Sequence, residues 1–173
     1  ATITNQAILS SAVWMRRRRK LPIDDFQNRD APEHRRGFEW RLDDFALYDI
    51  QRWAGRLTIT MTSDAPASAI KVRTRERLKF GEWNHVVMAY DGSGKAAGLV
   101  IYADGERLAV DVVQDTLTGS IRTDAPLTLG RGGTLGPPFL GQIDDLRLYN
   151  RLLTGSDVED LALHNRPRAI LSG

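Results

Sequence analysis

The sequence predicts an all-β fold in which two antiparallel sheets pack face to face and one short helix follows them. Three observations predict it. Apolar and polar residues alternate with a period of two along successive short runs, as in strands with one buried face. Turn-forming residues separate these runs, and the pair Asp104-Gly105 joins two of them as a hairpin. Helical periodicity is confined to one short segment near the C-terminus.

The alternating runs give the strands in chain order. They are QAILSSAV (6–13), GFEWRLDD (37–44), RLTITMTS (56–63), AIKVRTRE (69–76), EWNHVVMAYD (82–91), two strands within AGLVIYADGERLAVDVV (97–113), PLTLGR (126–131) and FLGQIDDLRLYN (139–150). Because side chains alternate between the faces of a strand, the apolar phase of each run identifies the core residues. The predicted core comprises Leu57, Ile59, Val86, Met88, Leu99, Ile101, Leu129 and Leu148.

Residues 14–36 interrupt this pattern with MRRRRK, two prolines and few apolar positions, which is typical of a long surface excursion. We expect it to contribute little to stability. Its basic run could attract polyanions. The alternative is that the run is a solvated loop with no ligand. Nucleic acid is not an expected partner. The candidate polyanion residues are Arg16, Arg17, Arg18, Arg19 and Lys20.

The helix is expected at about 155–165, where Thr154 with Asp157, or Ser156 with Glu159, could form a capping box. One domain, residues 1–165, then precedes a linker or tail at 166–173. A chain of 173 residues with 42% hydrophobic and 27% charged residues can bury one core. It has no cysteine, which excludes disulfides, thiolate metal sites and a covalently attached c-type haem, so no haem is expected within this chain.

Three motifs in order resemble the laminin-G-like family: EWNHVVMAYDGSGKAAGLVIYADGERL (82–108), PLTLGRGG (126–133) and FLGQIDDLRLYNRLLTGSDVEDL (139–161). The resemblance implies a concanavalin A-like jelly-roll sandwich. The family begins with strands that would precede Ala1, so we expect the first strand or strands to be absent and a sheet edge or core face to be uncovered.

Within that family, the stretches AIKVRT, GEWNHV, YDGSGKAAGLVIYADG and DTLTGSIRTDAPLTLGR are similar to the laminin-G-like domain of large planctomycete proteins. Those proteins also contain a c-type cytochrome domain. The similarity implies a periplasmic or extracellular location, with neighbouring domains or chains of the parent protein as partners. No apolar run approaches the ~18–20 residues of a membrane-spanning helix.

The strongest candidate metal site is the pair Asp144 and Asp145. In IDDLRLY the apolar phase slips by one residue at the two aspartates, which indicates a β-bulge. Adjacent carboxylates at such a distortion suit calcium, and the family resemblance also implies calcium here. The alternative is that the pair hydrogen-bonds a neighbouring loop.

The candidate ligand-binding residues are aromatic. Trp40, Tyr48 and Trp53, together with Trp14, could form a platform on which sugar rings stack, although the same side chains could instead pack the core. Trp83 is expected in the core, and the neighbouring His85 is expected to satisfy a hydrogen bond at the edge of the sandwich.

Catalytic residues are not expected. Glycosidases of this fold carry clustered carboxylates on one strand face, but here Arg41 separates Glu39 from Asp43. His34, His85 and His164 lack the spacing of zinc ligands. We therefore expect a non-catalytic interaction or architectural module of a larger secreted or periplasmic protein that can also carry haem. The alternative is a carbohydrate-binding module that serves a catalytic neighbour domain.

Overall fold

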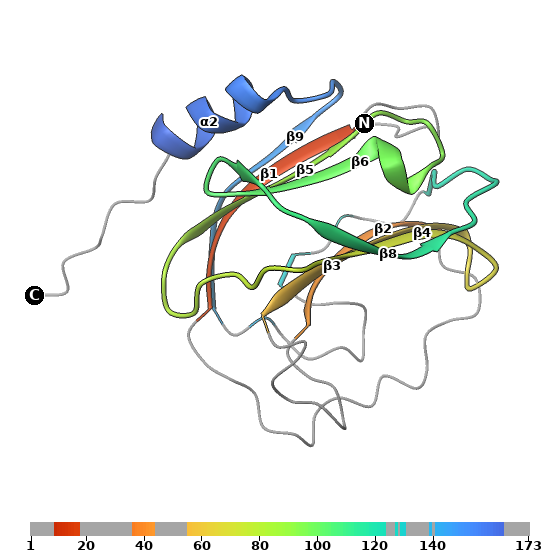
Figure 1. Ribbon diagram of the computed structural model, residues 1–173, viewed down its shortest axis with the longest axis horizontal. Coiled ribbons are helices and arrows are strands. Elements are labelled where there is room, and N and C mark those ends of the chain that lie inside the picture. Colours follow the sequence, from red (N-terminus) through yellow and green to blue (C-terminus); the bar gives the residue numbers. More distant parts are fainter. Residues whose placement is uncertain are drawn as a thin grey trace, which may run out of the picture.

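The computed structural model describes residues 9–17, 36–43, 55–123, 127, 129–130, 139 and 141–164. Within them two antiparallel sheets pack face to face, and a helix covers the outer side of one sheet (Figure 1). The predicted all-β sandwich with a short C-terminal helix is confirmed. No helix in this part of the chain is long and apolar enough to cross a membrane.

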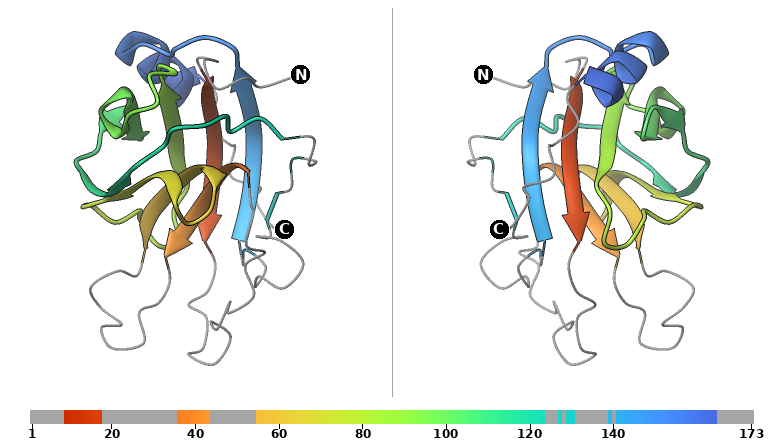
Figure 2. Two further views of the ribbon diagram at one scale, coloured as in Figure 1. Left: turned by 90° about the vertical axis from the view of Figure 1, so that its right-hand side faces the viewer. Right: turned by 90° about the vertical axis from the view of Figure 1, so that its left-hand side faces the viewer.

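The described strands form a five-stranded sheet of order β7-β6-β5-β1-β9 and a four-stranded sheet of order β2-β3-β4-β8. Figure 2 shows β1 between β5 and β9. The elements are β1 (Leu9–Arg17), β2 (Gly37–Asp43), β3 (Arg56–Asp64), β4 (Ser68–Thr74), β5 (Asn84–Tyr90), the 3-10 turn η2 (Ala96–Gly98), β6 (Leu99–Ala103), β7 (Glu106–Arg107), β8 (Val110–Asp115), β9 (Gly141–Tyr149) and α2 (Gly155–His164).

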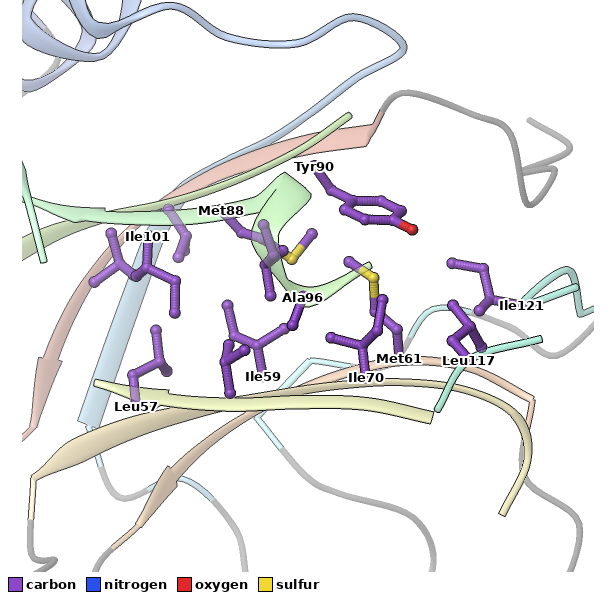
Figure 3. Close-up of a cluster of buried hydrophobic side chains, with 14 residues drawn as sticks. Leu57, Ile59, Met61, Ile70, Met88, Tyr90, Ala96, Ile101, Leu117 and Ile121 are labelled. Carbon is purple, nitrogen blue, oxygen red and sulfur yellow. The ribbon is translucent and has the colours of Figure 1, made fainter. Parts of the chain in front are cut away.

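The main core lies between the two sheets (Figure 3). Leu57, Ile59 and Met61 alternate along β3 and are at most 1% exposed, because every second residue of this strand faces the other sheet. Six of the predicted core residues are confirmed as buried. They are Leu57, Ile59, Val86, Met88, Leu99 and Ile101.

Two core predictions are wrong, since Leu129 is 56% exposed and Leu148 is 46% exposed. Leu129 lies outside any strand, so strand alternation does not apply to it. Leu148 pairs with Ser11 and has the inward phase, but among the described strands β9 is the edge strand of its sheet and has a neighbour on one side only. Ile143 of the same strand is 37% exposed. That the first strand or strands are absent, which leaves a sheet edge or core face uncovered, stays a prediction.

Residues 14–17, which were predicted to begin the surface excursion, instead belong to β1, which continues through Trp14 to Arg17. Trp14 is 3% exposed, and Met15 packs against the main core. Arg16 is tolerated in the strand because its guanidinium donates a hydrogen bond to Gln142 on β9. Residues 18–35 lie outside the described part of the chain.

The Asp104-Gly105 hairpin is confirmed. Ala103 pairs with Glu106, and both turn residues have positive φ, 51° at Asp104 and 90° at Gly105, as a type I′ turn requires. The run that follows does not form one strand. It divides into the short β7, which stays beside β6, and β8, which pairs with β4 in the other sheet.

The helix and its capping box are confirmed. The backbone N–H of Asp157 donates to Thr154 Oγ1 at 3.3 Å, and the N–H of Thr154 donates to Asp157 Oδ2 at 2.8 Å. Val158 is fully buried against Ala12 and Val87, in a second, smaller core on the outer face of the five-stranded sheet. This packing positions the rest of α2 over that face (Figure 1).

Candidate functional site

A groove of about 460 Å³ lies on the outer face of the five-stranded sheet, beside the second half of α2. Four separate segments line it. The helix contributes Glu159, Ala162 and Leu163; the β6–β7 hairpin contributes Asp104 and Gly105 from its turn and Glu106 from β7; the β4–β5 loop contributes Lys79, Glu82 and Trp83; and β1 contributes Trp14.

The β4–β5 loop is held in place by Asn84, a 3% exposed residue at the start of β5. Its side-chain oxygen accepts a hydrogen bond from the backbone N–H of Lys79 at 2.8 Å. Its amide nitrogen donates to the carbonyls of Lys79 and Glu82, both at 3.0 Å. One buried side chain therefore satisfies three backbone groups of the loop that presents Lys79, Glu82 and Trp83 to the groove.

The hairpin turn forms a second fixed wall. Asp104 Oδ1 accepts the backbone N–H of His85 at 2.9 Å, and Asp104 Oδ2 pairs with Lys79 Nζ at 2.9 Å. The next residue, Gly105, lies against the helix: a Cβ at this position would be 3.8 Å from Glu159 Cγ and 3.9 Å from Ala162 Cβ. The turn thus contacts both the loop and α2.

Trp14 lines the groove from the sheet and stacks obliquely on His85, with 5.0 Å between the ring centroids and an interplanar angle of 41°. The indole Nε1 of Trp14 and the Nδ1 of His85 are buried without a hydrogen-bond partner among the described residues. Burial lowers the pKa of His85 below its ordinary value of 6.5; Asp104 and Asp145 act in the opposite direction, and Arg147 lowers it further. His85 is therefore a neutral ring beneath the groove.

Trp83 is half-buried and is the second aromatic residue of the groove. The guanidinium carbon of Arg16 lies 5.4 Å from the centroid of its ring, within the range of a cation–π contact. Since Arg16 also bonds Gln142, this contact joins the Trp83 indole to the β1–β9 pair.

Three exposed carboxylates complete the groove: Glu82, Glu106 and Glu159. No hydrogen bond or ion pair joins these carboxylates to another residue in the described part of the chain. The groove therefore places the half-buried indole of Trp83 and the edge of the buried Trp14 beside carboxylates that no described residue engages.

Asp144 and Asp145 lie on β9, outside the groove. The predicted bulge is present: Ala12 pairs with Arg147 and Trp14 pairs with Asp144, so two residues of β9 oppose Val13, and Asp145 has φ 48°. Among the described residues, the partners of the two carboxylates are in β9 itself, and hydrogen bonding to a neighbouring loop stays a prediction. Asp144 Oδ1 accepts the N–H of Asp145 at 2.8 Å, and Asp145 Oδ1 pairs with Arg147 at 2.8 Å.

Calcium at this pair stays a prediction. Among the described residues, no group of three or more histidine or acidic side chains is placed to hold a metal ion.

The predicted aromatic platform is only partly described. Trp40, on β2, is half-buried and packs against the main core, which is the alternative that the sequence left open. Tyr48 and Trp53 lie outside the described residues. So do Arg18, Arg19 and Lys20 of the basic run, while Arg16 and Arg17 belong to β1. The roles proposed for these residues in ligand and polyanion binding stay predictions.

The groove itself was not predicted. Trp83 was expected in the core and lines the groove instead, and His85 lies in the central strand β5, with an unpartnered ring nitrogen, instead of at the sandwich edge. The signal present in the sequence was the position of Trp83 and Glu82 immediately before a strand, where side chains leave the alternating pattern.

A laminin-G family model, described as the concanavalin A-like lectin/glucanases superfamily, matches residues 10–159. A search of curated proteins finds no match. Among solved structures, the CBM40 of the Ruminococcus gnavus IT-sialidase, bound to α2,3-sialyllactose, is similar with a TM-score of 0.60 and 16% identity. The match covers 91% of this chain and 83% of that one.

A second solved structure, a putative carbohydrate-binding protein from Bacteroides ovatus, is similar with a TM-score of 0.51 and 16% identity. The match covers 89% of this chain but 40% of that chain, so this chain corresponds to less than half of that protein.

Proposed function

The chain belongs to the concanavalin A-like lectin/glucanase superfamily, and from this premise we propose that it is a non-catalytic carbohydrate-binding module whose ligand lies in the groove beside α2. This is the second of the two functions that the sequence left open. The comparisons favour it over a purely architectural role, because both similar structures are described as binding carbohydrate or as a CBM. At 16% identity they establish a shared fold, and the argument for function comes from the groove.

One observation carries the proposal: the half-buried Trp83 lines the same groove as three carboxylates that no described residue engages, with the buried Trp14 beneath it. The C–H face of a pyranose ring packs on an indole, and its hydroxyl groups donate hydrogen bonds to carboxylate oxygens. The volume of about 460 Å³ falls within the range of small-ligand sites. A short oligosaccharide fits these dimensions and this chemistry.

The absence of catalysis is part of the proposal. Glycosidases need two carboxyl groups at a fixed separation across the scissile bond, roughly 5–5.5 Å or 6.5–9.5 Å. The residue pair closest to that pattern in the sequence, Glu39 and Asp43, lies on β2 in the other sheet, with Arg41 between the two. We expect no reducing ends to be released when the protein is incubated with an oligosaccharide that it binds.

The biological context rests on the sequence resemblance alone. We propose that the module delivers a neighbouring domain of a secreted or periplasmic protein to its glycan. Determining the full gene tests this proposal, since it reveals which domains adjoin the sandwich.

A glycan array tests the proposed function. The wild-type protein is expected to retain a defined set of oligosaccharides, and Trp83→Ala is expected to bind them at least about tenfold more weakly, as for loss of a central aromatic contact. The matched control is Phe80→Ala, because Phe80 is an aromatic residue of the same loop, 50% exposed and outside the groove. The proposal is overturned if no glycan is retained, or if both variants bind as the wild type does.

A further inference from the structure

The charge of the groove narrows the class of sugar that it can bind. This inference rests on the proposed function, since it concerns the ligand of the same site. Among the described residues that line the groove, four contribute a carboxylate (Glu82, Asp104, Glu106 and Glu159) and one, Lys79, contributes a cationic group. At neutral pH the lining is therefore acidic.

The lysine does not offset this excess. Lys79 Nζ is 2.9 Å from Asp104 Oδ2, so its ammonium group is already paired with the one carboxylate that the fold itself uses. A further cation beside the groove is Arg16, whose guanidinium is engaged by Gln142 and by the Trp83 ring. What remains available to a ligand is the set Glu82, Glu106 and Glu159.

A metal ion does not account for these carboxylates. Calcium or a transition metal requires several ligands that converge on one point. In the described part of the chain, no three acidic or histidine side chains gather in that way. The three glutamates instead stand on three different elements around the groove: the β4–β5 loop, β7 and α2. Spread carboxylates suit an extended organic ligand with its positive charges apart.

The tryptophans point independently to the same chemistry. Indole is the aromatic ring that attracts cations most strongly, and it also offers an apolar face to a sugar ring. Trp14, which lines the groove and is 3% exposed, has a buried Nε1 without a hydrogen-bond partner among the described residues. The groove thus presents the half-buried indole of Trp83 beside acceptors that no described residue engages, while the Trp14 indole N–H is enclosed.

We propose that the groove binds amino sugars that carry a free ammonium group, in preference to neutral or acidic sugars. A sugar ring packs on Trp83, ring hydroxyls bond to the groove, and ammonium groups pair with Glu106, Glu159 and Glu82. An acidic sugar is disfavoured because its carboxylate faces like charges.

Isothermal titration calorimetry with four tetrasaccharides tests the inference: glucosamine, N-acetylglucosamine, glucose and galacturonic acid tetramers. The titrations are run at about pH 6, below the range in which an amine loses its proton. The glucosamine tetramer is expected to bind about tenfold more tightly than its N-acetylated counterpart in ~0.05 M salt. This advantage is expected to shrink in ~0.5 M salt, because the charges are exposed and screened.

Variants in which glutamate is replaced by neutral glutamine then test which carboxylates cause the preference for the glucosamine tetramer. The double variant Glu106→Gln, Glu159→Gln is expected to lose the preference for the glucosamine tetramer and to keep its binding of the glucose tetramer. The control Glu76→Gln removes an exposed glutamate outside the groove and is expected to keep the preference. Circular dichroism of each variant confirms that the fold is retained.

The outcomes separate the two proposals. Equal binding of the amino, N-acetylated and neutral tetramers overturns the amino-sugar inference and leaves carbohydrate binding standing. Tighter binding of the galacturonic acid tetramer also overturns it, as does an amine preference that survives in the double variant. Failure of every tetramer and every array glycan to bind overturns the proposed function itself.

Discussion

His85 is a titratable ring with 2% exposure, beneath Trp14 in the central strand of the five-stranded sheet. Desolvation lowers the pKa of this histidine and outweighs the nearby carboxylates of Asp104 and Asp145, which favour the charged form. The folded state therefore holds the neutral imidazole at a pH where an unfolded chain would already take up a proton.

This difference predicts an acid-sensitive fold. As the pH falls below about 6.5, the unfolded state binds a proton at this histidine and the folded state does not, so the free energy of unfolding decreases. The stabilising contribution is complete above the unfolded pKa and is lost progressively below it. Urea unfolding curves between about pH 7.5 and pH 5 measure the slope.

Two variants test whether His85 causes the pH dependence of the free energy of unfolding. His85→Phe keeps a ring at the position and removes the titration, so it is expected to flatten the pH dependence. His164→Gln removes an exposed histidine at the end of α2 and is expected to leave the slope unchanged. An identical slope in His85→Phe and wild type would contradict this account.

Individual groove residues could not be predicted from the sequence, for a physical reason. Trp14 and Glu159 are separated by most of the chain, and they line one groove only because α2 packs back over β1 and β5 through Val158. Trp83 was assigned to the core because tryptophan beside an apolar strand is usually buried. Leu148 has the inward phase but occupies an edge strand, and strand order is not visible in the local pattern.

At the level of elements, α2 is positioned by its capping box. Thr154→Ala removes the acceptor for the Asp157 N–H, and we expect it to lower the free energy of unfolding by about 1 kcal/mol. For a chain of this size the melting temperature should fall by roughly 2–4 °C. Thr154→Ser keeps a hydroxyl acceptor and is expected to stay near the wild-type value. If the alanine and serine variants melt together, the cap is not stabilising.

The β4–β5 loop depends on Asn84 in a similar way. Asn84→Ala leaves one N–H and two carbonyls of the loop without their partner, at a cost of roughly 1–3 kcal/mol for each group that stays buried. Because the loop presents Glu82 and Trp83, glycan affinity should fall as well, which makes Asn84 a positioning residue. The exposed Asn150→Ala is the control, and a stable Asn84 variant with unchanged affinity contradicts this role.

The β9 bulge could be predicted because an apolar phase slip is a local signal, but the partners of its two aspartates depend on tertiary structure. Calcium binding at Asp144 and Asp145 predicts that calcium raises the melting temperature by mass action, that a chelator reverses the rise, and that Asp144→Asn abolishes it. A melting temperature that changes neither with calcium nor with the chelator contradicts the calcium prediction. The pairing of Asp145 with Arg147 would then be the role of that carboxylate.

For the whole molecule, the sandwich was predictable because alternation is repeated in nearly every strand and the Asp104-Gly105 turn and the Thr154 cap are local motifs. The distribution of strands between the sheets was not. β8 leaves the hairpin and joins β4 because Val110 packs into the main core, a contact that no local pattern reveals. The groove forms only when α2 packs on the completed sheet. It was therefore the feature least predictable from local sequence patterns.

The location of the ligand is the central claim, and the indole N–H signals of the tryptophans report it directly. The chain has four tryptophans, and each signal in a ¹H–¹⁵N spectrum can be assigned with a single Trp→Phe variant. Titration with an oligosaccharide chosen from the array should shift the Trp83 and Trp14 signals together and leave Trp40, which packs on the main core, in place. If only the Trp53 signal moves, or the Trp83 and Trp14 signals stay fixed at saturating glycan, the ligand does not lie in the groove beside α2.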